Sequence, residues 1–220
     1  MRTIINPENW DRKSNYLFFK DFLNPSFSVT SEVECGDLFA AAKEHKFSFF
    51  LAYAYAILKA ANSIKELRYR YDENNNQIYL YDKLELLSPI QVNDEGKFFT
   101  VRLPFASDFV SFHQEAKEIL ANIPKENDPY NAELNPDTDK LGLILISATP
   151  KLYFTSITTT QKSRHGADYP LINVGKMVIR EGRNVMPIAI TANHGFVDGF
   201  HISLFFERIG ENMKQIVSAY

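Results

Sequence analysis

The order of hydrophobic and polar positions divides the chain into strands and helices that follow one another without a strict alternation. Segments that alternate in polarity and are rich in β-branched residues predict strands. The expected strands span residues 27–35, 68–73, 78–92, 97–105, 141–150, 152–160 and 175–193, the last broken into a hairpin at "EGRN". Apolar residues at helical spacing predict helices within 9–22, 35–64 (two helices), 108–123 and 198–220.

Polar residues before three of these helices are suited to cap them. Asp37, Ser48 and Asp108 each precede an apolar run and are expected to begin a helix there. The helix at about 48–63 is rich in alanine and aromatic residues on almost all sides, which predicts that it is buried. The polar stretch 124–140 is expected to be a surface loop.

The mixture of elements predicts the fold class. Strands and helices lack the regular strand–helix–strand order of a doubly wound parallel sheet, so we expect an α/β, two-layer sandwich with a mixed β-sheet packed by helices. No linker or repeat divides the chain, and a single domain over residues 1–220 is expected.

Composition narrows the classes of function. The formal net charge of −3 is too small for electrostatic binding of nucleic acid. Cys35 is the one cysteine, which excludes an internal disulfide and suits a reducing compartment. No apolar run reaches the about 18 to 20 residues of a membrane helix, and the N-terminus lacks an apolar core of signal-peptide length. We therefore expect a cytoplasmic protein without a membrane segment.

The segment "TANHGFVDGFH", residues 191–201, carries the strongest chemical signal. An apolar strand ends just before His194, Gly195 leaves room beside the imidazole, and Asp198–Gly199 turns the chain into a helix where Asp198 can cap or form a salt bridge. Histidine changes charge near neutral pH and can serve as a general base. The spacing of the two histidines and the aspartate does not match a common zinc site, so no metal is expected. The sequence also contains no Gly-x-Ser-x-Gly elbow for a serine nucleophile and no glycine-rich phosphate loop.

This segment resembles the active-site signature of the chloramphenicol acetyltransferases, His-His-x-x-x-Asp-Gly-Phe-His. Five further segments resemble the family in the same order along the chain: "NWDRKSNYLFF", "NPSFSVTSEVE", "KELRYRYDENNNQIYLYDKLELLSP", "ISATPKLYFTSIT" and "PLINVGK". The resemblance implies the CoA-dependent acyltransferase fold and an enzyme that moves acetyl from acetyl-CoA to a hydroxyl of chloramphenicol, a reaction that gives antibiotic resistance. It also implies a homotrimer with active sites at the subunit interfaces.

The resemblance assigns roles residue by residue. His194 would be the general base, and Ser147 would stabilise the tetrahedral oxyanion. Asp198 and Arg12 would form a pair that holds the shape of the site, while His201 is expected to be structural. Three further residues would bind ligands: Phe19 and Asn173 the acceptor or its water, and Lys176 the CoA.

Three positions depart from the family pattern. Asn193 replaces the first histidine of the pair, Phe19 takes the place of a tyrosine that contacts chloramphenicol, and Lys151 replaces a tryptophan. A site that loses hydrogen-bonding groups can reject its ligand, so the transfer machinery is better supported than the acceptor. Two alternatives remain open: an acyltransferase of this fold with another hydroxyl or thiol acceptor, as in dihydrolipoyl acyltransferases, and a non-catalytic binder of a small molecule.

Overall fold

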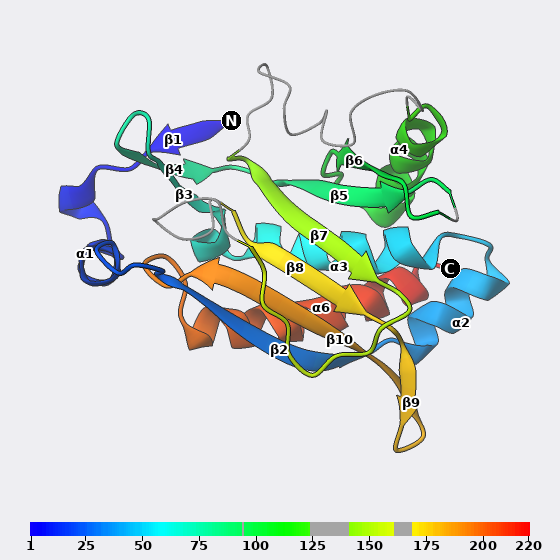
Figure 1. Ribbon diagram of the computed structural model, residues 1–220. Helices are drawn as coiled ribbons and strands as arrows, with labels where there is room; N and C mark the ends of the chain where they lie inside the picture. Colours follow the sequence, from blue (N-terminus) through cyan, green and yellow to red (C-terminus); the bar gives the residue numbers. More distant parts are fainter. Residues whose placement is uncertain (94, 124–140, 161–168) are drawn as a thin grey trace.

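The computed structural model describes residues 1–93, 95–123, 141–160 and 169–220 (Figure 1). Its helices are the 3-10 turns η1 (Pro7–Asn9) and η2 (Lys65–Arg68) and the α-helices α1 (Lys13–Phe19), α2 (Gly36–Glu44), α3 (Phe49–Ser63), α4 (Phe109–Ala121) and α6 (Gly199–Ser218). Its strands are β1 (Arg2–Ile4), β2 (Ser26–Glu34), β3 (Tyr69–Asp72), β4 (Gln77–Tyr81), β5 (Glu85–Gln91), β6 (Phe98–Leu103), β7 (Leu143–Thr149), β8 (Leu171–Gly175), β9 (Val178–Arg180) and β10 (Arg183–Asn193). None of these helices combines the length and the hydropathy that spanning a membrane requires.

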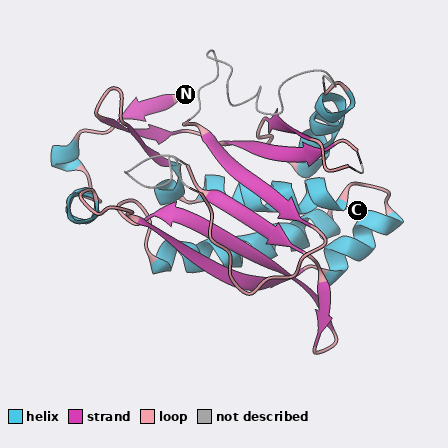
Figure 2. Ribbon diagram, viewed as in Figure 1, coloured by secondary structure: helices cyan, strands magenta, loops and turns pink. Residues whose placement is uncertain are grey.

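The larger sheet is mixed, as the sequence predicts. Its strands follow the order β2-β10-β8-β7-β5-β6, and β9 pairs with β10 outside this path. β7 runs parallel to both β5 and β8, whereas the other pairs are antiparallel. A smaller antiparallel sheet has the order β1-β4-β3. Helices α3 and α6 cover one face of the larger sheet (Figures 1 and 2), which gives the expected two-layer sandwich.

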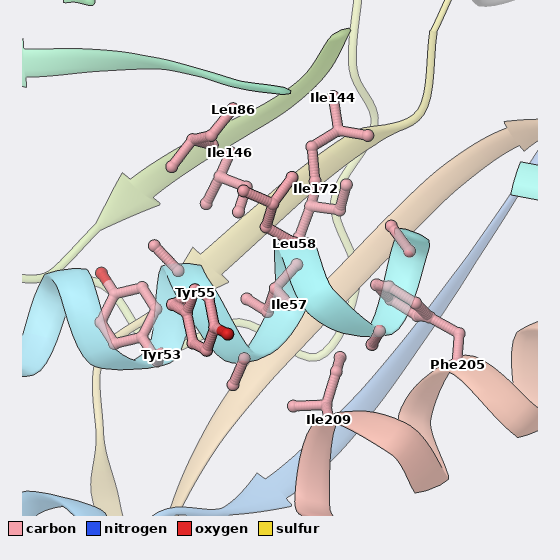
Figure 3. Close-up of a cluster of buried hydrophobic side chains, with 14 of the residues drawn as sticks. Tyr53, Tyr55, Ile57, Leu58, Leu86, Ile144, Ile146, Ile172, Phe205 and Ile209 are labelled. Atoms are coloured by element: carbon pink, nitrogen blue, oxygen red, sulfur yellow. The ribbon is translucent and has the colours of Figure 1, made fainter. Parts of the chain in front are cut away.

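The core lies between this sheet and the two covering helices. Ile146 and Ile172 are register partners on β7 and β8, and their side chains point toward Leu58 of α3 (Figure 3). Phe205 and Ile209 of α6 close the cluster from the other side, and all five of these side chains are buried. Because successive strand side chains alternate between faces, the neighbours of the two isoleucines along each strand face away from the helices.

The buried helix predicted at 48–63 is confirmed as α3. The Ser48 hydroxyl accepts a hydrogen bond from the Leu51 amide at 3.3 Å and so caps the helix, and ten of its residues are buried. Asp108 caps α4 in the same way through the Ser111 amide at 2.9 Å. A side-chain oxygen at these positions satisfies an amide that the helix itself leaves unpaired.

The predicted cap at Asp37 is wrong. Helix α2 begins at Gly36, with Cys35 at the cap position, and Asp37 lies inside the first turn. The Cys35 amide donates to the Asn184 carbonyl at 2.9 Å, so pairing with β10 holds the chain in the sheet until the residue where the helix starts. In the first turn the Asp37 carboxylate still interacts favourably with the positive end of the helix dipole.

The predicted strand at 152–160 is also wrong, because this segment forms no strand. β7 and β8 are parallel neighbours, so the chain that leaves β7 must return to the opposite end of the sheet before it can enter β8. Residues 152–160 belong to that return and run across the face of the sheet that α3 and α6 leave free (Figure 1).

Other strand boundaries differ less. The segment predicted at 78–92 divides into β4 and β5, while the short strands β1 and β8 are additions that the polarity pattern does not predict. The hairpin at 181–184 is confirmed: Glu181 and Gly182, with φ of 50° and 76°, form the two-residue turn between β9 and β10. The loop predicted at 124–140 lies outside the described residues.

Candidate active site

His194 follows the last residue of β10 and is held at the end of the sheet. Its amide donates to the Pro25 carbonyl at 2.8 Å, which continues the pairing of β10 with β2 by one residue. The imidazole stacks on the Phe19 ring with centroids 4.2 Å apart and planes inclined by 11°, and the Phe27 ring lies 4.4 Å away on a tilt. Two aromatic rings therefore fix the plane of the imidazole.

The hydrogen bonds of His194 define its tautomer. Nδ1 lies 3.0 Å from the Val197 carbonyl oxygen. A carbonyl oxygen only accepts, so Nδ1 must carry the proton and donate. In the neutral ring the lone pair is then on Nε2, and no described residue bonds to that atom. This is the arrangement that a general base requires.

The turn after His194 is built by Asn193 and Gly195. The Asn193 side-chain oxygen accepts from the Gly195 amide at 2.8 Å, and its carbonyl accepts from the amides of Phe196 and Val197. A Cβ on Gly195 would lie 3.1 Å from that side-chain oxygen and 3.4 Å from Cα of Tyr16, so glycine suits the close packing of the turn against α1. The asparagine that departs from the family pattern therefore has a structural role.

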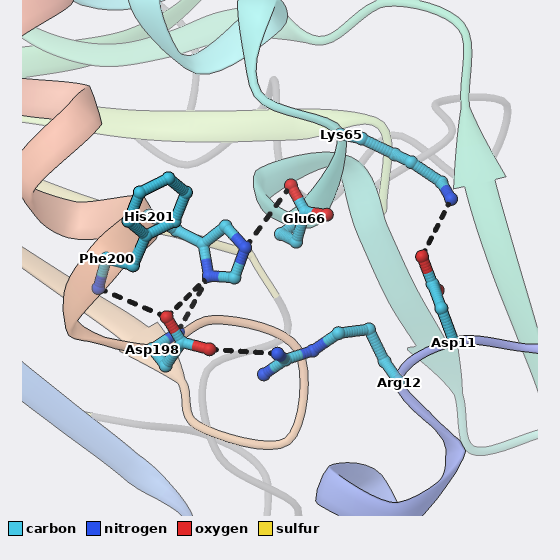
Figure 4. Close-up of polar contacts among 7 residues, drawn as sticks. All are labelled: Asp11, Arg12, Lys65, Glu66, Asp198, Phe200 and His201. Carbon is cyan, nitrogen blue, oxygen red and sulfur yellow. Dashed lines mark hydrogen bonds and ion pairs between the residues drawn. The ribbon is translucent and has the colours of Figure 1, made fainter.

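Asp198 joins this turn to the N-terminal segment. Its carboxylate caps α6 by accepting from the Phe200 amide at 3.1 Å, and its other oxygen accepts from Arg12 at 2.9 Å (Figure 4). Burial opposes ionisation of this carboxyl, but the hydrogen bond from Arg12 and the charges of His201 and Arg12 outweigh it and lower the pKa of Asp198 below its ordinary value. The predicted Arg12–Asp198 pair is thus present in the structure.

His201 extends the network to a residue that the sequence did not single out. Its Nδ1 lies 3.2 Å from the Asp198 amide and 2.9 Å from one Asp198 carboxylate oxygen. On the other side of the ring, Nε2 lies 3.6 Å from the Glu66 carboxylate (Figure 4). Glu66 comes from η2, far from the motif in the chain, and the one signal that contains it is the family-like stretch that begins "KELR".

Ser147, Asn173 and Lys176 lie in another part of the sheet. Ser147 and Asn173 are register partners on β7 and β8, and they face away from the helices because their neighbours Ile146 and Ile172 face toward them. Lys176 is exposed directly after β8, where its amide donates to the Leu152 carbonyl at 2.8 Å.

The chain does not bring these two groups of residues together. Asn173 is paired with Ala189, which precedes His194 by five residues on β10. At the rise of an extended strand this is about 17 Å along the sheet, and Ser147 lies a further two strands across, about 10 Å. Figure 1 shows the end of β10 beside α1, opposite the ends of β7 and β8. Within one chain, therefore, His194 and Ser147 are too far apart to act on the same acetyl group.

The sequence model of the chloramphenicol acetyltransferase family matches residues 2–210, which is nearly the whole chain. The chain belongs to this family. It is 25% identical over 215 residues to a chloramphenicol acetyltransferase of Staphylococcus aureus, covering 97% of this chain and 96% of the relative. It is 22% identical over 209 residues to chloramphenicol acetyltransferase 3 of Escherichia coli, covering 95% of each.

Solved structures agree with the assignment to the chloramphenicol acetyltransferase family. A structure named chloramphenicol acetyltransferase superposes with a TM-score of 0.93 at 54% identity, covering 97% of this chain and all of that chain. The cubic core of the pyruvate dehydrogenase multienzyme complex shares the fold, with a TM-score of 0.63 at 12% identity over 93% and 88% of the two chains. The predicted family, fold and acyltransferase type are therefore confirmed.

Proposed function

We propose that this protein transfers the acetyl group of acetyl-CoA to a hydroxyl of chloramphenicol, with His194 as general base. The observation that carries the proposal is the hydrogen bond from His194 Nδ1 to the Val197 carbonyl, which leaves Nε2 ready to accept a proton. Membership of a family that uses acetyl-CoA, over residues 2–210, supports the choice of both substrates.

The proposed transfer occurs in one complex of enzyme, acetyl-CoA and acceptor. Nε2 of His194 takes the hydroxyl proton while the oxygen attacks the thioester carbonyl, forming a tetrahedral oxyanion. When this intermediate collapses, the carbon–sulfur bond breaks, the CoA thiolate leaves, and the proton on Nε2 passes to the sulfur. General-base catalysis of this kind contributes about a hundred- to ten-thousand-fold in rate.

Ser147 is proposed to donate its hydroxyl to the oxyanion, which requires a second copy of the chain. The separation of His194 and Ser147 within one chain supports an active site in which these residues come from neighbouring subunits. The apolar cluster that α1 and the following residues expose close to His194 also supports coverage by a partner; it comprises Leu17, Phe18, Phe22 and Leu23. We propose a homotrimer in which residues 1–220 form one domain of each subunit.

The remaining ligand-binding residues are assigned by their positions. Phe19, which stacks on the base, is proposed to contact the acceptor next to its reacting hydroxyl. Asn173, buried beside Ser147, is proposed to hold a water or an acceptor hydroxyl through its amide. Lys176, exposed at the end of β8, is proposed to lie near the CoA, since a lysine attracts its phosphates.

The experiment follows CoA thiol release from acetyl-CoA with and without chloramphenicol. We expect release that depends on chloramphenicol and falls about a hundred- to ten-thousand-fold in His194→Ala. His45→Ala is the matched control, because His45 is exposed at the end of α2. Release with dihydrolipoamide but not with chloramphenicol would assign another acceptor. Release that survives in His194→Ala would remove His194 from the mechanism.

A further inference from the structure

A groove of about 760 Å³ lies beside α6, between that helix and the segment 32–38, which ends β2 and begins α2. Small-molecule sites have volumes of about 300–1,000 Å³, so the groove is large enough for a drug-sized ligand. Glu34 in its lining is paired with Val185, nine residues before His194 along the chain. About 30 Å of extended chain therefore separates the groove from the candidate base.

One stripe of α6 forms a wall of the groove, and the middle of this stripe has no side chain. Phe206, Gly210, Met213 and Val217 follow one another at spacings of three and four residues and so share one side of the helix. A Cβ on Gly210 would have no heavy atom within 4 Å. No tight contact therefore requires glycine here, although glycine destabilises a helix interior relative to alanine. Its effect in the structure is to keep the centre of the groove hollow.

The floor of the groove is apolar and preformed. Val33, Leu38 and Met213 are buried members of the main core, and Phe206 and Val217 are half-buried against it. A ligand with an apolar body would cover the exposed parts of these side chains, which is favourable in proportion to the covered area. Because the core already fixes them, little ordering of the protein opposes binding.

The rim of the groove is negatively charged. Among the described residues, the carboxylates of Glu34, Asp37 and Glu207 have no hydrogen-bond or ion-pair partner. The fourth carboxylate of the lining, on Glu32, is neutralised by an arginine 2.6 Å away, and Lys214 supplies one positive charge. The unpaired carboxylates outnumber this lysine, so the rim attracts a cation and repels an anion.

We propose that this groove is a second binding site, which takes a small hydrophobic cation: an amine or a quaternary ammonium group on an aromatic or alkyl body. The apolar body lies on the floor and over Gly210, and the positive group faces the carboxylates of the rim. The site goes beyond the proposed function, because its occupant takes no part in acetyl transfer.

The experiment measures binding of auramine O, a fluorescent hydrophobic cation, with chloramphenicol and CoA present throughout so that the dye does not report on the candidate active site. We expect saturable binding of one dye per chain. Gly210→Leu fills the hollow and should weaken binding about tenfold or more. Ser203→Leu is the matched control, because Ser203 is exposed on the same helix outside the groove. Both variants should release CoA at a rate within about twofold of the parent protein, since neither residue belongs to the candidate active site.

The charge of the rim is tested separately. Glu34→Gln combined with Glu207→Gln should weaken dye binding about four- to tenfold, and added salt should weaken it in the parent protein. The anion 1-anilinonaphthalene-8-sulfonate, of similar size, should show no component of binding that Gly210→Leu removes. Denaturant unfolding checks that Gly210→Leu is folded, and the double variant decides the matter if it is not.

The proposal is overturned if Gly210→Leu binds auramine O as tightly as the parent protein does, or if the anion occupies the groove as tightly as the cation. A change of oligomeric state in Gly210→Leu, measured by light scattering, would assign the groove to a second copy of the chain and also overturn it. Failure of the proposed function looks different, because the parent protein then releases no CoA while the dye still binds.

Discussion

At the scale of single residues, Phe19 stacks on His194 and has no hydrogen-bonding group. The resemblance implies a tyrosine at this position that contacts chloramphenicol. We predict that Phe19→Tyr lowers the KM for chloramphenicol about two- to tenfold with little change in kcat, because one hydrogen bond to the bound acceptor is added. The measurement is the KM from CoA release. Phe22→Tyr is the control, since Phe22 contacts Phe19 but has no ring contact with His194. An unchanged KM in Phe19→Tyr would show that residue 19 does not face the acceptor.

The lowered pKa of Asp198 predicts a pH-dependent contribution to stability. Because the carboxyl ionises more easily in the folded state than in the unfolded chain, its contribution is complete above about pH 5 and disappears as the pH falls through the lowered pKa. We expect the parent protein to exceed Asp198→Asn in stability by up to about 1 kcal/mol at pH 7. Thermal unfolding from pH 7 to pH 3 should show this difference shrinking. A difference that grows toward low pH would contradict the assignment.

The single cysteine is predicted to be inert. Burial, together with the neighbouring Glu34, raises the pKa of the Cys35 thiol to about 12, so that it stays protonated at neutral pH. We expect no reaction of the folded protein with a chromogenic disulfide at pH 7.5 over the duration of an assay, and one equivalent after unfolding. When the same disulfide is used to follow CoA release, it then detects the CoA thiol and not Cys35. Rapid reaction of the folded protein would show that the thiol is accessible.

At the scale of elements, two glycines provide a matched test of the packing. A Cβ on Gly175, at the end of β8, would lie 2.6 Å from Cγ of Pro187 and 2.9 Å from the Leu152 carbonyl, neither of which moves easily. We predict that Gly175→Ala lowers the free energy of unfolding by about 1–3 kcal/mol. Gly210→Ala, in the interior of α6 with open space around it, should raise it by about 0.5–1 kcal/mol. Denaturant unfolding measures both, and a loss in both variants would refute the packing argument.

The elements that the sequence predicts correctly are those with local signals. The α3 helix has its cap and its apolar run within one stretch, and the β9–β10 hairpin has its turn residues between its strands. The errors in the strand predictions arise where pairing between distant segments decides whether a stretch forms a strand. Segment 152–160 has strand-like composition, but the parallel pairing of β7 and β8 makes it part of the return. β8 is buried along its whole length, so its residues do not alternate in polarity, and it is defined by its two neighbours in the sheet.

The residues of the candidate site also divide into those that the sequence predicts and those that only the fold brings together. His194 and Asp198 lie in one short motif, and the resemblance that this motif carries leads to Arg12, which the structure places in contact with Asp198. Glu66 could not be predicted, because the contact with His201 exists only once η2 packs beside the start of α6. The distance between His194 and Ser147 also could not be predicted, since it depends on the order and register of the strands.

At the scale of the whole molecule, the strand register sets the distance between the two proposed catalytic residues. His194 lies at one end of the sheet and Ser147 toward the other, so the proposed base and the proposed oxyanion donor can act on the same acetyl group only if they come from different subunits. Ser147 and Asn173 lie on the face of the sheet that α3 and α6 do not cover; residues 152–160 run across this face, Asn173 is buried and Ser147 is half-buried.

The measurement that tests this claim most directly is complementation between two inactive variants. His194→Ala and Ser147→Ala are co-expressed with different tags, and assemblies that carry both tags are assayed for CoA release. A cyclic trimer of this kind contains one interface with both residues intact, so we predict about one third of the parental activity. Activity no higher than that of the two variants assayed separately would contradict a site shared between subunits.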